Sequence, residues 1–212
     1  MRRSNLFAFR PFFSLVIFCL GLLSVSCYEL TPEDYLTEGD DYLSKGSYAE
    51  AVNSYKTGLD LLGEDESLLT ILSLETNLAT ALSLMSLNHE AIQHYQKVIS
   101  TYMAEIDEIA DHETANYAKD IAATSAFYLG MEYQDAGQAE NAVESYGYAI
   151  VLDPNHWSAL ANLGSVLHDN LSNHDEALNA YNKAYEILTS KDIVPSDPTA
   201  EPRSILSELQ YR

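Results

Sequence analysis

The sequence contains little cysteine and little positive charge. Its 212 residues include two cysteines, which excludes a framework of several disulfides. Eleven Lys and Arg stand against 32 Asp and Glu, for a net charge of −21. Nucleic-acid phosphates and anionic membrane surfaces are both recognised through clusters of basic residues. The charge balance therefore argues against nucleic-acid binding and against electrostatic docking on a membrane.

Motifs of common enzymes and metal sites are also missing. We find no phosphate-binding loop, no Gly-x-Ser-x-Gly and no calcium-binding loop. The six histidines form no His-Glu-x-x-His, since His94 follows His89 by one residue too many. Isolated histidines of this kind are more typical of surface or capping positions than of metal ligands. We expect no enzymatic activity, no metal site and no cofactor.

The first 26 residues differ from the rest of the chain. Three of the eleven basic residues (Arg2, Arg3 and Arg10) precede the first acid, Glu29, and an apolar stretch runs from residue 11 to 23. A comfortable membrane span needs about 20 apolar residues, whereas a secretory signal needs about 7–15. Residues 1–26 are therefore predicted to be an export signal.

The end of this signal resembles that of bacterial lipoproteins. Small residues 24–26 precede Cys27, which the resemblance implies to be acylated, for example with palmitate; residues 27–31 would then be the lipidated anchor segment. In the usual motif an apolar residue stands three places before the cysteine, where this chain has Ser24. A cleaved signal without lipid and an uncleaved anchor are the alternatives. Tyr28 follows the cysteine in place of the Asp that marks retention at the inner membrane, which favours the outer membrane.

One pattern occurs four times in the body of the chain. A small residue is followed twelve residues later by Ala, and that Ala four residues later by Tyr. The triplets are Gly39, Ala51 and Tyr55; Ala79, Ala91 and Tyr95; Gly130, Ala142 and Tyr146; and Gly164, Ala177 and Tyr181. The last copy has a spacing of thirteen, which predicts one extra residue in its turn. A single helical hairpin cannot bury its apolar face, so neighbouring copies must stack.

The pattern resembles the tetratricopeptide repeat (TPR) family, in which Leu-Gly, an aromatic residue and an Ala recur at these distances. The resemblance implies an all-α, right-handed solenoid of about four hairpins over residues 32–191, with repeats near 32–65, 72–105, 123–156 and 157–191. Asp153-Pro154 ends the third copy, and Asn155 is expected to cap the next helix.

Two segments do not follow the repeat. Residues 106–122 contain no Pro or Gly and are predicted to extend the flanking helices around a turn near 111–114, either as a longer helix pair or as an arm for a partner. Residues 192–212 begin with three prolines and end with Ile205, Leu206 and Leu209 at helical spacing. They are predicted to form a linker and a short capping helix, with a disordered end or a partner-binding peptide as alternatives.

The resemblance also implies a partner-binding groove lined by the first helix of each hairpin. Leu36, Asp40, Leu43, Thr76, Thr80 and His168 are expected to face it, and the strongest candidates for binding are Asn77, Phe127, Tyr128, Met131, Gln134, Asn162 and Ser165. The two asparagines occupy equivalent places and could hold a peptide backbone, or they could cap helices. Phe127, Tyr128 and Met131 could form an apolar patch, although Phe127 could equally belong to the core.

Together these patterns predict a lipid-anchored, non-enzymatic interaction scaffold on the periplasmic face of a bacterial envelope membrane. No Lys or Arg falls at the candidate groove positions, so the partner should be a neutral or basic segment of another envelope protein. The alternative is a ligand-binding accessory subunit of an envelope transport system, with a closed cavity at residues 127–131.

Overall fold

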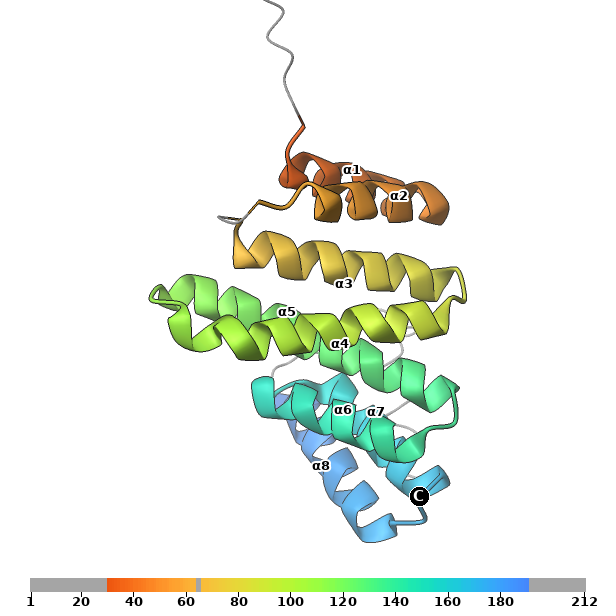
Figure 1. Cartoon of the computed structure of the whole chain (residues 1–212). Coiled ribbons are helices and arrows are strands. Elements are labelled where there is room, and N and C mark those ends of the chain that lie inside the picture. Colours follow the sequence, from red (N-terminus) through yellow and green to blue (C-terminus); the bar gives the residue numbers. More distant parts are fainter. Residues whose placement is uncertain (1–29, 64–65, 191–212) are drawn as a thin grey trace, which may run out of the picture.

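The computed structural model describes residues 30–63 and 66–190 (Figure 1). The helices are α1 (Pro32–Ser44), α2 (Tyr48–Asp60), α3 (Leu68–Leu84), α4 (Asn88–Glu105), α5 (His112–Asp135), α6 (Ala139–Leu152), α7 (Trp157–Asp169) and α8 (His174–Ser190), with a short 3₁₀ helix, η1 (Ile106–Glu108). These described ranges contain no strand. The predicted signal, Cys27, the linker and the capping helix lie outside them. None of the described helices combines the length and the apolarity needed to cross a bilayer.

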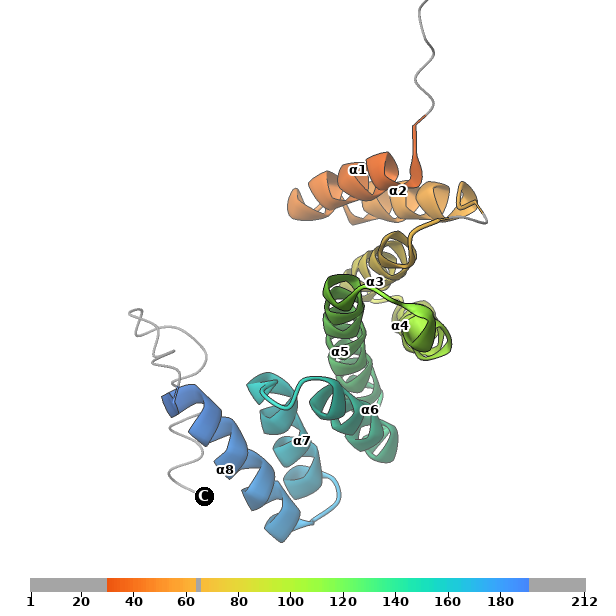
Figure 2. The ribbon, with the colours of Figure 1, turned by 90° about the vertical axis from the view of Figure 1, so that its left-hand side faces the viewer.

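Consecutive helices pair as hairpins, and the hairpins stack in chain order. Each helix packs on the next one, and α3 also packs on α1 and α5. The view in Figure 2 shows the stack curving, with α3 and α5 toward its inner side. The predicted all-α solenoid of four hairpins is confirmed.

Helix starts follow from local capping. At α1, the Thr31 hydroxyl accepts from the amide of Asp34 while the Asp34 carboxylate accepts from the amide of Thr31, and Pro32 supplies a preset helical φ. At α5, the Asp111 carboxylate accepts from the amide of Thr114 at 2.8 Å. The expected cap Asn155 is not the one used at α7. His156 caps that helix instead, with its Nδ1 accepting from the amide of Ala159 at 3.3 Å.

Turns within the hairpins share one geometry. Three residues connect α1 to α2, α3 to α4 and α5 to α6, whereas four connect α7 to α8, as the longer spacing of the last copy predicted. The left-handed position of each turn is Gly46, Ser86, Gly137 or Ser172, with φ between 53° and 75°. Glycine tolerates this conformation without steric cost, so the two serines are strained.

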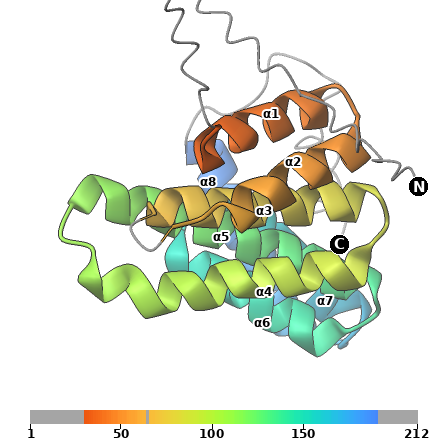
Figure 3. The same ribbon diagram turned by 45° about the horizontal axis from the view of Figure 1, so that its top comes forward.

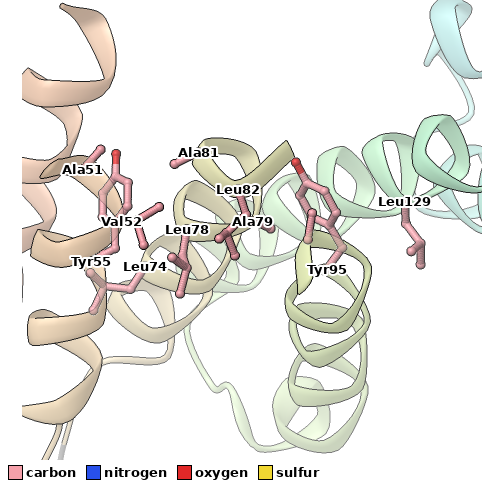
Figure 4. Packing of buried hydrophobic residues seen from close by; sticks show 11 residues of the cluster. Ala51, Val52, Tyr55, Leu74, Leu78, Ala79, Ala81, Leu82, Tyr95 and Leu129 are labelled. Carbon is pink, nitrogen blue, oxygen red and sulfur yellow. The ribbon is translucent and has the colours of Figure 1, made fainter. Parts of the chain in front are cut away.

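The glycines of the first, third and fourth repeats make room for the tyrosine of their own hairpin. A Cβ atom added to Gly130 would lie 2.5 Å from a ring carbon of Tyr146, and one added to Gly39 would lie 2.3 Å from Tyr55. The rings of Tyr55, Tyr95 and Tyr146 are fully buried. Figure 4 shows Tyr55 and Tyr95 on either side of the apolar residues of α3.

Residues 106–122 were expected to extend both flanking helices, but they extend only α5, because α4 ends at Glu105 and residues 106–108 form η1. Helix α4 has 18 residues and α5 has 24, against 13 for α2 and 14 for α6. Figure 3 shows the turn between α4 and α5 projecting beyond the ends of the neighbouring helices. The turn was expected near 111–114, but α5 already begins at His112, because Asp111 caps it, so the turn lies earlier.

Candidate functional site

The buried tyrosines turn their hydroxyl groups toward the first helices of the hairpins, where the binding residues were predicted. At the first junction between repeats, where the first hairpin meets the second, the Tyr55 hydroxyl donates to Oδ1 of Asp40 at 2.7 Å. Nδ2 of Asn77, which belongs to the next repeat, donates to the same oxygen at 2.8 Å. Asp40 thus joins a tyrosine of its own hairpin to an asparagine of the following one.

Aromatic stacking replaces the asparagine at the second junction. The Tyr95 hydroxyl lies 3.1 Å from the hydroxyl of Thr80, in the same hairpin. The ring of Tyr128, from the next repeat, stacks on Tyr95 with 5.9 Å between ring centroids. Tyr128 stands two residues before Gly130, as Asn77 stands two residues before Ala79.

The third junction again contains an asparagine. The Tyr146 hydroxyl donates to Oε1 of Gln134 at 2.8 Å and accepts from Nδ2 of Asn162 at 3.4 Å. Asn162 also stands two residues before its small residue, Gly164. We refer to Asp40, Tyr55, Asn77, Thr80, Tyr95, Tyr128, Gln134, Tyr146 and Asn162 as the tyrosine ladder.

The three buried phenols of the ladder, Tyr55, Tyr95 and Tyr146, remain protonated. Burial raises the pKa of Tyr55 above its ordinary range, and the hydrogen bond to Asp40 and the charge of that carboxylate raise it further. Burial likewise raises the pKa of Tyr95 and of Tyr146. These hydroxyls are therefore hydrogen-bond donors at physiological pH.

The two predicted asparagines lie at equivalent places, and each keeps hydrogen-bonding capacity. An amide side chain has two donors and an acceptor oxygen. Within the described ranges, Asn77 hydrogen-bonds Asp40 and the Tyr55 hydroxyl, Asn162 donates to Tyr146, and both asparagines are half-buried. Each asparagine thus braces two repeats, and its side-chain oxygen has no hydrogen-bond partner among the described residues.

The predicted apolar patch is largely packed into the protein. Phe127 is half-buried, with its ring centroid 4.8 Å from that of His156 and 5.9 Å from that of Tyr146. Tyr128 is half-buried beside it, whereas Met131 is 38% exposed. Of the three, Met131 is the exposed side chain. The alternative that assigns Phe127 to the core fits this packing.

The remaining predicted positions differ in exposure. Ser165 is half-buried and its hydroxyl donates to Asp169 at 3.1 Å. His168 lies at the end of α7 with its Nδ1 2.9 Å from Nδ1 of His174. Thr76 was expected to face the groove, which is wrong. It is buried, and its hydroxyl lies 2.9 Å from that of Ser125 in α5, because one residue along a helix turns a side chain by about 100°.

The ladder carries negative charge. Asp40 is part of it, and the charge of Asp135 contributes to the raised pKa of Tyr146. Glu132 lies beside Tyr95, is buried, and accepts from the hydroxyl of Ser83 through one oxygen, while its other oxygen has no hydrogen-bond partner among the described residues. None of the ion pairs found in the described ranges brings a lysine to these acids.

Two features were not predicted from the sequence. Glu75 is 1% exposed, and its carboxylate meets Nδ1 of His94 at 2.6 Å and Nζ of Lys97 at 2.5 Å. The sequence did offer a signal for this buried ion pair, because Glu75 is the only acid in the apolar stretch 68–84. The second feature is a groove between α4 and α6, which no repeat motif encodes. In the described part of the chain, no three His, Cys, Asp or Glu gather closely enough to hold a metal ion.

Comparison with known proteins identifies the repeat. The model of the family described as tetratricopeptide repeat matches residues 128–198. The matched part of the chain carries tetratricopeptide repeats. The TPR match begins inside α5 and covers α6, α7 and α8, whereas the first two hairpins share the spacing and the fold. Solenoids of stacked repeats present extended surfaces to other proteins, and the TPR fold suggests that this chain is an interaction scaffold.

Solved structures resemble the whole array. BtubC from P. vanneervenii is 15% identical, with a TM-score of 0.63, over 82% of this chain and 71% of that one. YrrB, described as a TPR protein with an unusual peptide-binding site, is 20% identical with a TM-score of 0.53, over 74% and 68%. A TPR protein from Parabacteroides merdae is 22% identical with a TM-score of 0.53, over 84% and 60%. At these identities the likeness shows the fold alone.

One curated relative shares a short stretch of sequence. The DnaJ homolog subfamily C member 3 homolog of Dictyostelium discoideum is 41% identical over 54 residues. The match spans 24% of this chain and 11% of that protein. It thus concerns a short stretch and leaves most of the relative without a counterpart in the match.

Proposed function

We propose that this TPR chain is a membrane-anchored interaction scaffold of the bacterial cell envelope, which binds a segment of another protein along the tyrosine ladder. The observation that carries the proposal is the pair Asn77 and Asn162. They stand at the same place in two repeats, half-buried, each with a side-chain oxygen that no described residue engages. Repeated amides at fixed spacing suit the repeated N–H and C=O groups of an extended peptide.

The chemistry of the surface defines the partner. Asp40 at one end and Asp135 nearer the other favour Lys or Arg, and Met131 between them offers an apolar contact. We expect an extended, uncharged or basic segment with an apolar side chain near its middle. A free carboxylate should be disfavoured, because the surface has no cation to neutralise it.

The anchor is the second part of the proposal. The lipoprotein-like leader supports acylation of Cys27, which lies outside the described residues. The absence of Asp after the cysteine supports the outer membrane and its periplasmic face. Several acyl chains on one residue would hold the protein stably, since each buried methylene contributes about 0.8 kcal/mol.

Crosslinking in the native bacterium tests both parts. A photoreactive residue at position 131 of the full-length chain should capture a defined envelope protein, and the same residue at exposed Lys183 on α8 should not. The capture at 131 should weaken in the double variant Asn77→Ala/Asn162→Ala. Asn53→Ala/Asn179→Ala is the matched control, because both asparagines are exposed on second helices.

Different failures refute different parts. Equal capture from positions 131 and 183 would place the partner elsewhere than the ladder. Cys27→Ser should release the chain from the membrane fraction and remove labelling by a palmitate analogue. Unchanged labelling and fractionation in that variant would refute the lipid anchor and leave the ladder untouched.

A further inference from the structure

A groove with a cavity volume of about 540 Å³ lies between α4 and α6, with α5 as its floor. Its walls are helix faces: Ile99 and Met103 come from α4, and Glu144, Tyr148 and Val151 from α6. Tyr133 of α5 lies on the floor and accepts a hydrogen bond from Gln96 at 2.6 Å. In Figure 2, α4 lies on the opposite side of α5 from α7, away from the inner side of the curve. This α4–α6 groove is therefore separate from the tyrosine ladder.

The long C-terminal part of α4 builds one wall of the groove. Helix α2 ends nine residues after its repeat alanine, Ala51, and α6 ends ten residues after Ala142. Helix α4 continues for fourteen residues after Ala91, and Met103 stands at the twelfth. Met103 therefore lies in a helical turn that α2 and α6 lack. The longer helix pair supplies an apolar wall that a regular repeat would not have.

The lining divides into an apolar end and a charged middle. Met103 is 61% exposed and Val151 is 74% exposed, and Ile99 and Tyr148 lie beside them. In Figure 1, α4 and α6 run in the same direction, so Met103 and Val151 lie toward the same end. Glu144 is two helical turns before Val151, about 10 Å along the axis, and makes no ion pair within the described ranges.

We propose that the α4–α6 groove is a second docking site, which takes an amphipathic helical segment of a protein partner. The apolar side chains of this partner helix, at helical spacing, would cover Met103 and Val151. A Lys or Arg of the partner helix, about two turns away, would face Glu144. The cavity volume lies in the range of roughly 300–1,000 Å³ that is usual for ligand sites. Helices recognised in grooves present anchors at such spacing. Glu144, the only charged residue of the lining, selects a cation.

Two labelled probe peptides test this site by fluorescence anisotropy with the full-length chain. Both are Ala-rich helices with leucines at positions i, i+3 and i+4, and they carry Lys or Glu two turns from the leucines. The Lys peptide should bind about fivefold more tightly than the Glu peptide, because an exposed ion pair contributes up to about that factor. Glu144→Lys should reverse this order. Glu140→Lys, on the same helix but outside the lining, should not.

The apolar end is tested in the same way. Met103→Ser and Val151→Ser should each weaken both peptides about tenfold, since each removes several buried carbons from the contact. Leu178→Ser, at a 57% exposed site on α8, is the matched control and should have no effect. The double variant Asn77→Ala/Asn162→Ala should also bind both peptides normally, which separates this site from the ladder.

Several outcomes would overturn the proposal. Binding of neither peptide would do so, as would an unchanged order of affinity in Glu144→Lys. A chain that sediments as a dimer and becomes a monomer on Met103→Ser would assign the groove to a second copy. Peptide binding that appears only after removal of residues 191–212 would assign it to the chain's own C-terminal segment.

Discussion

Oε2 of Glu75 in α3 lies 2.6 Å from Nδ1 of His94 in α4, inside the second hairpin, although the Glu75 side chain is almost fully buried. Burial raises the pKa of this carboxyl, but hydrogen bonds from His94 and Lys97, with the charge of Lys97, outweigh it. The pKa of Glu75 therefore lies below its ordinary value of 4.5. The folded state holds Glu75 ionised by pairing it with partners from the neighbouring helix.

This pairing predicts a pH dependence of stability. The contribution of Glu75 is fully present above its unfolded pKa and is lost as the pH falls through the lower folded value. Glu75→Gln should destabilise the chain by about 1–3 kcal/mol at pH 7, because His94 and Lys97 lose a charged partner. Between pH 5 and 3 the difference from the unmodified chain should shrink. Thermal melts followed by circular dichroism measure this difference in stability at each pH. A difference that stays constant with pH, or the same behaviour in exposed Glu90→Gln, would contradict the prediction.

Packing against tyrosine predicts opposite effects for two glycines. Gly130→Ala should destabilise the array by about 1–3 kcal/mol, because the new methyl group would overlap the ring of Tyr146. Gly147→Ala should stabilise it by about 1 kcal/mol, since a Cβ there meets nothing within 4 Å and Ala favours the helix. Urea unfolding measures both. Equal signs for the two variants would refute the overlap.

Backbone strain predicts a stabilising substitution in the second turn. Ser86 has φ of 61°, in the left-handed region, where Gly46 and Gly137 stand in two other hairpins. Ser86→Gly should raise the free energy of unfolding by about 0.5–1 kcal/mol, because the steric cost of a Cβ there is removed. Ser100→Gly, inside α4, should instead lower it. Loss of stability in Ser86→Gly would show that the serine is not strained.

Capping by His156 predicts a second pH range, higher than that of Glu75, in which the stability of the fold changes. Burial lowers the pKa of this imidazole, so the folded state favours the neutral ring, whose Nδ1 accepts from the amide of Ala159. The stabilisation is present above the ordinary pKa of about 6.5 and is lost as the pH falls through the depressed folded value. His156→Asn keeps a capping acceptor but does not titrate. Its melting temperature should fall less than that of the unmodified chain between pH 7 and 5, and parallel curves would contradict this.

The fold was predictable from the sequence because the small residue, the Ala and the Tyr of each repeat recur at nearly constant distances along the chain. The distances from Gly130 to Ala142 and Tyr146 recur, and the thirteen-residue spacing in the last copy correctly placed an extra residue in its turn. These distances reflect one local contact, in which a small residue accepts an aromatic ring. Such a contact is set within one hairpin and needs no knowledge of the rest of the chain.

The surface was harder to predict, because it depends on rotation about each helix. Asn77 lies half-buried where two repeats meet, yet its neighbour Thr76, which was expected to face the same groove, is buried against Ser125. The hydrogen bond from Asn77 to Asp40 joins residues 37 apart, and no single repeat encodes it. The α4–α6 groove likewise requires two hairpins and a lengthened helix, so it became visible only in three dimensions.

The position of the single tryptophan has a consequence for unfolding experiments. Trp157 begins α7 and packs against residues of α8, in the hairpin with the four-residue turn and the strained Ser172. Within the described array this hairpin has a neighbour on one side only, so it should open at lower denaturant than the middle of the stack. Indole fluorescence will then record fraying of the last repeat while ellipticity records the whole array. Two non-coincident curves from one sample would be the signature of partial cooperativity along the solenoid.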